Sequence, residues 1–238
     1  PEISSYKAMI AYNLEPEMYA ISGLTSFIEL AKEKNLNAYP IHLKIDTGMH
    51  RLGFEEEDIE ELISLLQHNN FVKVTSIFSH LSATDNLDFK DFTLHQIQLF
   101  ESISNTISTT LNIQPIRHIL NTSGIFNFSE YQFEMVRLGI GIYGVGNSEE
   151  EQNSLENVST LKSIISQIRT VGANDSVGYS RKFMVKKEMR IATIPIGYAD
   201  GIRRAWGNEK GFVSINNQEA TILGNVCMEM LMVYVTRI

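Results

Sequence analysis

The feature of the sequence that most constrains its fold is a repeated alternation of short apolar runs with stretches of helical periodicity. The run IHLKID at 41–46 is followed by an apolar stripe at 59–66. The run VTSIFSH at 74–80 is followed by a second stripe at 92–107. This alternation is typical of strand and helix units that build a parallel sheet, so the first part of the chain is predicted to be α/β.

The same reasoning assigns the neighbouring segments of this part. KAMIAYN at 7–13 is predicted as the first strand, and a helix is predicted to open at Pro16, because proline is favoured at the first helical position. IRHIL at 116–120 and FEMVRLGI at 133–140 are predicted as two further strands, with a brief helical segment near Ser123–Phe126 between them. Five such units are fewer than the eight that close a barrel, so a partial (β/α)8 TIM-like barrel is expected.

The character of the sequence changes after the polar, acidic tract GNSEEEQNS, and we place a domain boundary there, near residue 150. Residues 1–150 then form the partial α/β barrel, and residues 151–238 form a mainly β domain. Strands are predicted within STLKSIISQIRTV, RKFMVKKEMRIATIPIGYADG and TILGNVCMEMLMVYVT, which are rich in β-branched residues. INNQ at 215–218 is predicted as a hairpin turn.

Composition excludes several classes of function. The formal net charge is −8 and no basic stripe is present, which argues against binding of nucleic acid. No apolar run approaches the ~20 residues of a membrane span. The single cysteine, Cys227, excludes an internal disulfide framework, and a cytoplasmic location is expected.

Polar residues recur near the ends of successive predicted strands, where a parallel α/β barrel keeps its active site. Each one alone also fits a surface loop or a helix cap. Their joint recurrence on four loops favours a common site formed by Asp46, Arg51, His80, Asn121, Thr122 and Arg137.

Four further motifs suggest chemistry, although each also fits a structural role. The glycines of VRLGIGIYG let the backbone approach a phosphate. Tyr179 in VGYSRKF could serve as a base if nearby positive charge lowers its pKa. GYADG is predicted as a turn that carries Tyr198 and Asp200, with Arg203 and Arg204 after it ready to meet anions. VCMEM is expected to be a strand in which the backbone N–H of Met228 is free for a carboxylate. No metal site is predicted, because no cluster of Cys, His and carboxylates has zinc spacing.

Seven motifs resemble, in order and spacing, those of bacterial alanine racemase, a pyridoxal-phosphate enzyme of fold type III. They are HLKIDTGMHRLGF, FSHLSATDN, HILNTSG, MVRLGIGIYG, VGYSRKF, IATIPIGYADG and GNVCMEMLMVYVT. The resemblance covers essentially the whole chain. It implies an α/β barrel, a C-terminal β domain and a head-to-tail homodimer whose sites combine both subunits. RHILNTSGI and NVSTLKSIISQI look most like racemases fused to a cell-wall Mur ligase.

The resemblance also implies roles for individual residues. Tyr179 would remove the α-proton, Arg137 would face the pyridine nitrogen of the cofactor, and His80 would link the two. Lys44 would be carbamylated and would brace Arg51. The cofactor would further contact Thr122, Gly139, Ile140 and Asn121. The substrate carboxylate would meet Arg51 and the backbone N–H of Met228, and the substrate corridor would be lined by Tyr198, Arg203 and Asp85.

The implied reaction is the interconversion of L-alanine and D-alanine by two bases on opposite faces of a planar carbanion, which supplies D-alanine for peptidoglycan. The family's second base is the lysine that binds the cofactor covalently, and no lysine here stands in that context. We therefore expect that the first barrel strands and the C-terminal tail are missing, and that this polypeptide alone is inactive. The alternatives are a serine racemase domain, a fold-type III decarboxylase and a non-catalytic binding domain.

Overall fold

A computed structural model describes residues 1–238, which divide into two compact units. The first, here called the α/β unit, comprises residues 1–159, and the second, the β unit, comprises residues 160–238. The short helix α6 (Glu149–Asn153) lies within the tract in which the sequence predicts a boundary.

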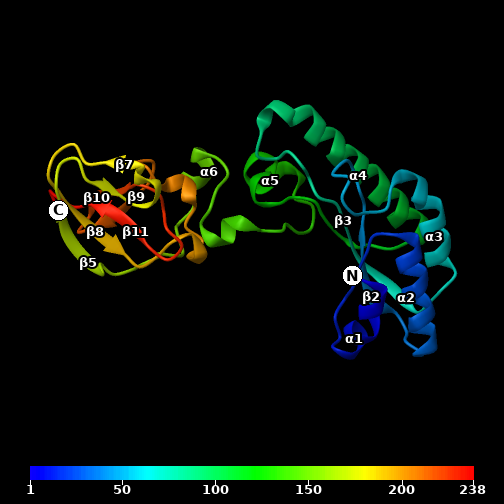
Figure 1. Ribbon diagram of the computed structural model, residues 1–238. Helices are drawn as coiled ribbons and strands as arrows, with labels where there is room; N and C mark the ends of the chain where they lie inside the picture. Colours follow the sequence, from blue (N-terminus) through cyan, green and yellow to red (C-terminus); the bar gives the residue numbers. More distant parts are fainter. The chain divides into compact units, whose positions relative to one another are not determined.

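The α/β unit is built on a parallel sheet of four strands in the order β1-β2-β3-β4. Three long helices connect the strands and follow one another along one side of the sheet (Figure 1). The strands are β1 (Glu17–Met18), β2 (Tyr39–Lys44), β3 (Val72–Phe78) and β4 (Ile116–His118), and the helices are α2 (Ile21–Glu33), α3 (Ile59–Gln67) and α4 (Lys90–Leu111). This is a partial α/β barrel, as predicted.

The apolar periodicity of the sequence explains how this unit packs. In α2, Leu24, Phe27 and Ala31 recur at helical spacing and are fully buried. In β2, Ile41 and Leu43 alternate with polar residues and enter the same core. One face of each element is therefore apolar, and burying it against its neighbours stabilises the unit.

Shorter helices occupy the connections. They are α1 (Tyr6–Ala11), α5 (Thr122–Asn127) and the 3-10 turns η1 (Ile3–Ser5), η2 (Glu56–Asp58), η3 (Leu87–Phe89), η4 (Ser129–Tyr131), η5 (Ile140–Tyr143), η6 (Tyr179–Arg181), η7 (Tyr198–Asp200) and η8 (Arg204–Trp206). The helix α5 confirms the helical segment predicted near Ser123–Phe126.

The β unit contains an antiparallel sheet of five strands in the order β5-β8-β11-β10-β9 and a small hairpin, β6-β7. The strands are β5 (Gln167–Val171), β6 (Ser176–Val177), β7 (Phe183–Met184), β8 (Met189–Ile194), β9 (Phe212–Ile215), β10 (Gln218–Leu223) and β11 (Leu231–Tyr234). Asn216 and Asn217 join β9 to β10 with φ values of 50° and 61°, which confirms the predicted hairpin turn.

Two predictions for the N-terminal region are wrong. Residues 7–13 form most of helix α1 rather than a strand, and the helix lets Tyr6 pack edge-to-face on Phe27 at 5.1 Å between ring centroids. A short apolar run does not distinguish a strand from a buried helix. Pro16 does not open a helix either: its carbonyl accepts from the backbone N–H of His42, and α2 begins only at Ile21.

The strand predicted at 133–140 is also wrong, so the sheet has four parallel strands instead of five. The segment runs beside β4 through only two backbone hydrogen bonds, from Glu134 N to Arg117 O and from Arg137 N to Leu120 O. Phe133 has a φ of +52°, which interrupts extended backbone. The ladder therefore does not continue.

In the β unit, two predicted strands are shorter than expected. The strand of 159–171 begins only at Gln167. Residues 226–230 form a turn closed by a hydrogen bond from Cys227 N to Met230 O (2.9 Å), so VCMEM is not a strand.

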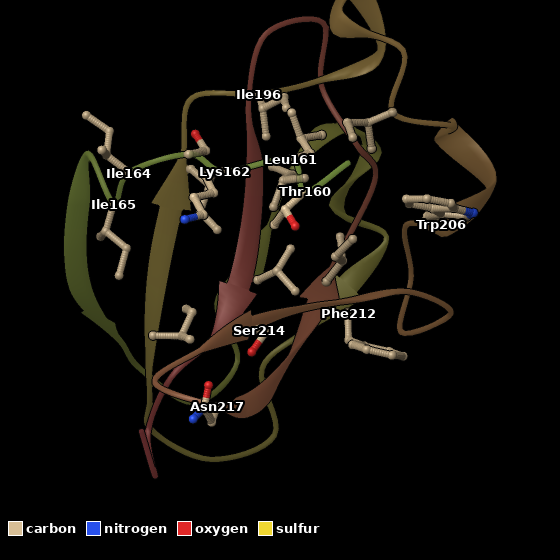
Figure 2. A pocket seen from close by; sticks show the side chains of 17 residues that line it. Thr160, Leu161, Lys162, Ile164, Ile165, Ile196, Trp206, Phe212, Ser214 and Asn217 are labelled. Atoms are coloured by element: carbon tan, nitrogen blue, oxygen red, sulfur yellow. The ribbon is translucent and has the colours of Figure 1, made fainter. Parts of the chain in front are cut away.

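A cavity of about 830 Å³ lies on the sheet of the β unit and is lined mainly by apolar side chains (Figure 2). Leu161, Ile164, Trp206 and Phe212 are among them, and the only charged lining residue is Lys162. No predicted site residue lines this cavity. None of the helices is both long and apolar enough to cross a membrane.

Candidate active site

The turn after β2 is organised by Asp46. Its Oδ1 accepts hydrogen bonds from the backbone N–H groups of Gly48 (2.8 Å), Met49 (2.9 Å) and His50 (3.1 Å), and its Oδ2 accepts from Arg51 N at 3.1 Å. Burial by itself would raise the pKa of Asp46, but the four backbone donors outweigh it, and the pKa lies below its usual value. Asp46 therefore anchors the loop that carries the exposed Arg51 side chain.

Glycine is required where this turn folds back on β2. Gly53 has a φ of +147°, and a Cβ at this position would lie 2.3 Å from the backbone nitrogen of Asp46. Phe54 N then donates to Lys44 O, and Asp46 N donates to Phe54 O. The position of Arg51 thus follows from local sequence rather than from distant packing.

Arg137 lies at the centre of the polar cluster at the strand ends. Its Nη1 contacts His118 Nδ1 at 2.6 Å, and its Nη2 contacts His80 Nδ1 at 3.3 Å. Its Nη2 also donates to the Ser79 carbonyl at 2.7 Å, and its guanidinium lies over the Phe78 ring at 5.2 Å. Burial lowers the pKa of Arg137 to about 10, so the guanidinium is still charged at neutral pH.

Both histidines beside Arg137 are held in the neutral form. Burial, and then the positive charge of Arg137, lowers the pKa of His80 to about 4. The same two causes lower the pKa of His118 to about 4. A guanidinium only donates hydrogen bonds, so each Nδ1 is an acceptor and each ring carries its proton on Nε2.

A pocket of about 320 Å³ lies next to this cluster. Thr122 Oγ1 accepts from the backbone N–H groups of Gly139 (3.1 Å) and Gly141 (3.2 Å). The pocket is lined by His80, Thr84, Asp85, Asn121, Thr122, Ser123, Gly139, Ile140 and Asn147. Five of the six residues predicted to contact a cofactor therefore line this pocket, as does Asp85. The sixth, Arg137, contacts the lining residue His80.

Two residues in this region have mainly structural contacts. Asn121 caps α5, since its Oδ1 accepts from Gly124 N (2.9 Å) and from Thr84 Oγ1 (2.8 Å). Lys44 is buried and its Nζ forms an ion pair with Glu17 at 3.2 Å. The predicted contact between a modified Lys44 and Arg51 stays a prediction.

The β unit brings other predicted residues onto neighbouring loops. Tyr198 N donates to Cys227 O (3.0 Å), and Ala199 N donates to Met228 O (2.9 Å), so the turn at 197–201 lies against the turn at 227–230. Asn225 Nδ2 donates to the carbonyl of Tyr179 at 3.1 Å, which attaches a third loop. The side chains of Tyr179, Met228 and Tyr198 are 68%, 56% and 44% exposed.

Sequence reasoning missed one residue of these clusters, His118, and named Arg204 only as a possible anion contact. The guanidinium over the Tyr198 ring is that of Arg204, at 5.5 Å, rather than that of the predicted corridor residue Arg203. His118 was not singled out, because it lies inside the predicted strand 116–120, whereas β4 ends at His118 itself. A search for every polar residue at the end of β4 would have found it.

The fold and this site define a class of protein. It has a partial α/β barrel with a pocket beside an arginine–histidine cluster, followed in sequence by an antiparallel β unit. The family is given by comparison with known sequences. Residues 1–147 match the alanine racemase N-terminal domain, and residues 158–238 match the alanine racemase C-terminal domain. The chain belongs to the alanine racemase family.

Individual relatives agree with this assignment. An alanine racemase of Fusobacterium nucleatum is 42% identical over 222 residues, which cover 92% of this chain and 60% of that protein. Alanine racemase 1 of Clostridium acetobutylicum is 34% identical over 239 residues, which cover 98% of this chain and 61% of that protein. The chain thus spans about three fifths of the length of these curated relatives.

Solved structures show the same fold. The alanine racemase of Clostridium difficile 630 superimposes with a TM-score of 0.86 at 27% identity, covering 100% of this chain and 62% of that one. An alanine racemase from Bartonella henselae with covalently bound pyridoxal phosphate gives a TM-score of 0.81 at 25% identity, and the match covers 98% of this chain and 63% of that one.

Proposed function

We propose that the intact protein interconverts L-alanine and D-alanine with pyridoxal phosphate, and thereby supplies D-alanine for peptidoglycan. The observation that carries the proposal is the charged Arg137 between two neutral histidines, beside a pocket whose wall contains a hydroxyl and backbone amides. The names of the relatives support the substrate, and the Bartonella henselae structure supports the cofactor.

The residues around the pocket fit a phosphorylated pyridine. The Thr122 hydroxyl lies within hydrogen-bond distance of the amides of Gly139 and Gly141, and a Cβ on Gly141 would approach Thr122 Cγ2 to 2.7 Å. Glycine at this position therefore avoids a clash with Thr122 and leaves the backbone N–H groups of the wall accessible as donors to a phosphate. Pyridoxal phosphate, when bound, supplies an electron sink that makes the α-C–H of an amino acid more acidic.

The chain's own residues would then orient the reactants. Arg137, whose side chain stays protonated at neutral pH, can donate a hydrogen bond to a ring nitrogen but does not transfer a proton to it. Asn121 and Ile140 line the same pocket and limit the volume available to the ring. Asp46 holds the turn from which Arg51 would bind the substrate carboxylate.

The β unit would supply the base and part of the substrate corridor. The exposed phenol of Tyr179 would remove a proton from the α-carbon, and the backbone N–H of Met228 would help to bind the carboxylate. Tyr198, Arg203 and Asp85 would line the corridor. We propose a cytoplasmic homodimer in which Tyr179 serves the pocket of the partner subunit. The predicted fusion to a ligase stays a prediction.

Exchange of the α-hydrogen tests this function. The intact gene product, supplied with pyridoxal phosphate in deuterated water, should incorporate deuterium into both L- and D-alanine, as followed by proton NMR. L-Serine is the control for substrate choice. Absence of exchange into either amino acid refutes racemisation, and exchange into serine but not alanine refutes the alanine assignment.

A further inference from the structure

An uninterrupted series of side-chain contacts leads from Arg137 to the surface of the α/β unit. Arg137 Nη1 lies 2.6 Å from His118 Nδ1, and His118 Nε2 lies 3.1 Å from Ser76 Oγ. Ser76 Oγ lies 2.7 Å from His42 Nδ1, and His42 Nε2 lies 2.9 Å from Glu15 Oε2. Five side chains from different parts of the chain are thus joined end to end.

The donors and acceptors of this series can be assigned from its two ends. The guanidinium only donates, so His118 Nδ1 accepts and neutral His118 has its proton on Nε2, which donates to Ser76. At the other end the Glu15 carboxylate only accepts, so His42 donates to it through Nε2. When the His42 ring is neutral, its Nδ1 accepts from the Ser76 hydroxyl, and all four hydrogen bonds then run in one direction, from Arg137 towards Glu15.

A strand irregularity puts two members of the series opposite each other. Between β2 and β3, Ile41 pairs with Val74, but the register shifts at the next residue, so that His42 pairs with Ser76. Without the shift His42 would pair with Thr75, so Thr75 is the extra residue of a bulge in β3 that brings Ser76 opposite His42. The bulge therefore creates the contact between His42 and Ser76.

The middle of the series is buried, and its outer end is accessible to solvent. Ser76 and His118 are 1% and 5% exposed, whereas the side chains of His42 and Glu15 are 28% and 43% exposed. The inner hydrogen bonds lie in a low-dielectric interior where polar groups polarise one another, and the outer end carries a charge. The His118 ring also stacks on the Phe78 ring, with 4.8 Å between the ring centroids, and the Arg137 guanidinium lies over the same Phe78 ring at 5.2 Å.

We propose that Glu15, His42 and Ser76 are positioning residues that act through His118 on Arg137. The series, here called the Glu15 relay, holds His118 in the tautomer that accepts from the guanidinium and increases the basicity of the accepting nitrogen. Its role in turnover rests on the proposed racemase function, in which Arg137 faces the ring of the cofactor. The tautomers themselves do not depend on that function.

The tautomers are tested directly by NMR of the intact protein labelled with ¹⁵N-histidine, with signals assigned by His42→Asn and His118→Asn variants. At about pH 9, where histidine rings are neutral, both rings should show a protonated Nε2 and a non-protonated Nδ1. A protonated Nδ1 on either ring overturns the relay. This measurement requires no cofactor and no activity, so it also decides the matter if the intact protein does not racemise alanine.

Substitution at the exposed end tests whether the relay is connected. Glu15→Gln should shift the nitrogen signals of His42 strongly and those of His118 more weakly, because an amide both donates and accepts. Glu33→Gln is the matched control, since Glu33 is exposed at the end of α2 and contacts none of the relay residues. If Glu15→Gln shifts His118 no more than the control does, the connection is refuted.

Kinetics of the intact holoenzyme test the positioning role. Ser76→Ala should lower kcat about tenfold, the scale typical of an outer hydrogen-bond partner, while the KM for alanine changes less than about twofold. Ser76→Thr, which keeps the hydroxyl, should restore most of kcat. An unchanged kcat in a folded Ser76→Ala protein refutes the role. If that variant does not fold, Glu15→Gln decides instead, with a smaller fall in kcat expected and no fall refuting the role.

Discussion

The two units present their predicted site residues in opposite ways. In the α/β unit, Arg137 is held by hydrogen bonds to two histidines and to backbone carbonyls, and both histidines have lowered pKa values. In the β unit, Tyr179 and Met228 have largely exposed side chains on loops. One unit contains a site whose polar groups already satisfy one another, whereas the other presents side chains that remain available for contact.

This difference separates stability from turnover. Removing a side chain of the preorganised cluster leaves buried donors or acceptors unsatisfied, so it should destabilise the fold. Removing the hydroxyl of an exposed side chain leaves the fold intact and affects only the chemistry that it performs. Substitutions in the two units should therefore give different combinations of stability and activity.

The largest effect is expected for Tyr179→Phe. Loss of the proposed base should lower kcat about 10²- to 10⁴-fold. The free energy of unfolding should change by less than about 0.5 kcal/mol, because the ring is 68% exposed. Racemisation assays and thermal unfolding of the intact protein measure both quantities. Tyr143→Phe is the control, since that phenol is 66% exposed and has no proposed role; equal activity of the two variants would contradict the role of Tyr179.

The next largest effect is expected for Arg137→Ala. The substitution strands His118 Nδ1 and the Ser79 carbonyl in a part-buried cluster, and should lower the free energy of unfolding by about 3 kcal/mol. Arg117→Ala is the matched control, because its pair with Glu134 lies nearer the solvent and should contribute about 1 kcal/mol or less. Denaturant titration compares the two, and equal losses would mean that the cluster is not preorganised.

A pH titration sharpens the comparison, because all six histidines lie in the α/β unit. His80 and His118 have pKa values of about 4 in the folded chain and about 6.5 when unfolded, so the unfolded chain binds more protons between these values. Stability should be constant above about pH 6.5 and fall as the pH decreases towards 4, by a few kcal/mol in order of magnitude. Hydrogen exchange should locate this loss in the α/β unit, and an equal loss in the β unit would contradict it.

The smallest effect concerns Lys44. Its Nζ pairs with Glu17 at 3.2 Å as an ammonium, and this pair opposes the proposed carbamylation, which would turn the group into an anion. Glu17→Gln should increase the carbamylated fraction a few-fold, equivalent to about 1 kcal/mol or less. NMR of the intact protein in ¹³C-bicarbonate detects the carbamate carbon, with Glu33→Gln as the control. No signal in either variant would refute carbamylation.

Local sequence predicted some elements correctly and others not. The turn of 46–54 and the hairpin at 215–218 follow from side chains and backbone angles within a few residues, and both were predictable. The segments at 7–13 and 133–140 were misassigned, because short apolar runs fit a helix, a strand or an irregular segment equally well. Tertiary packing decided between these structures.

The sequence by itself determined the α/β and β classes, the motifs of the racemase family, and the residues that could bind an anion or move a proton. Only the tertiary structure decided that Arg137 lies between His80 and His118, which are 57 and 19 residues away. It also decided that Ser76 joins His118 to His42. The physical reason is that hydrogen-bond partners across strands depend on register, and a single bulge at Thr75 in β3 changes which side chains meet.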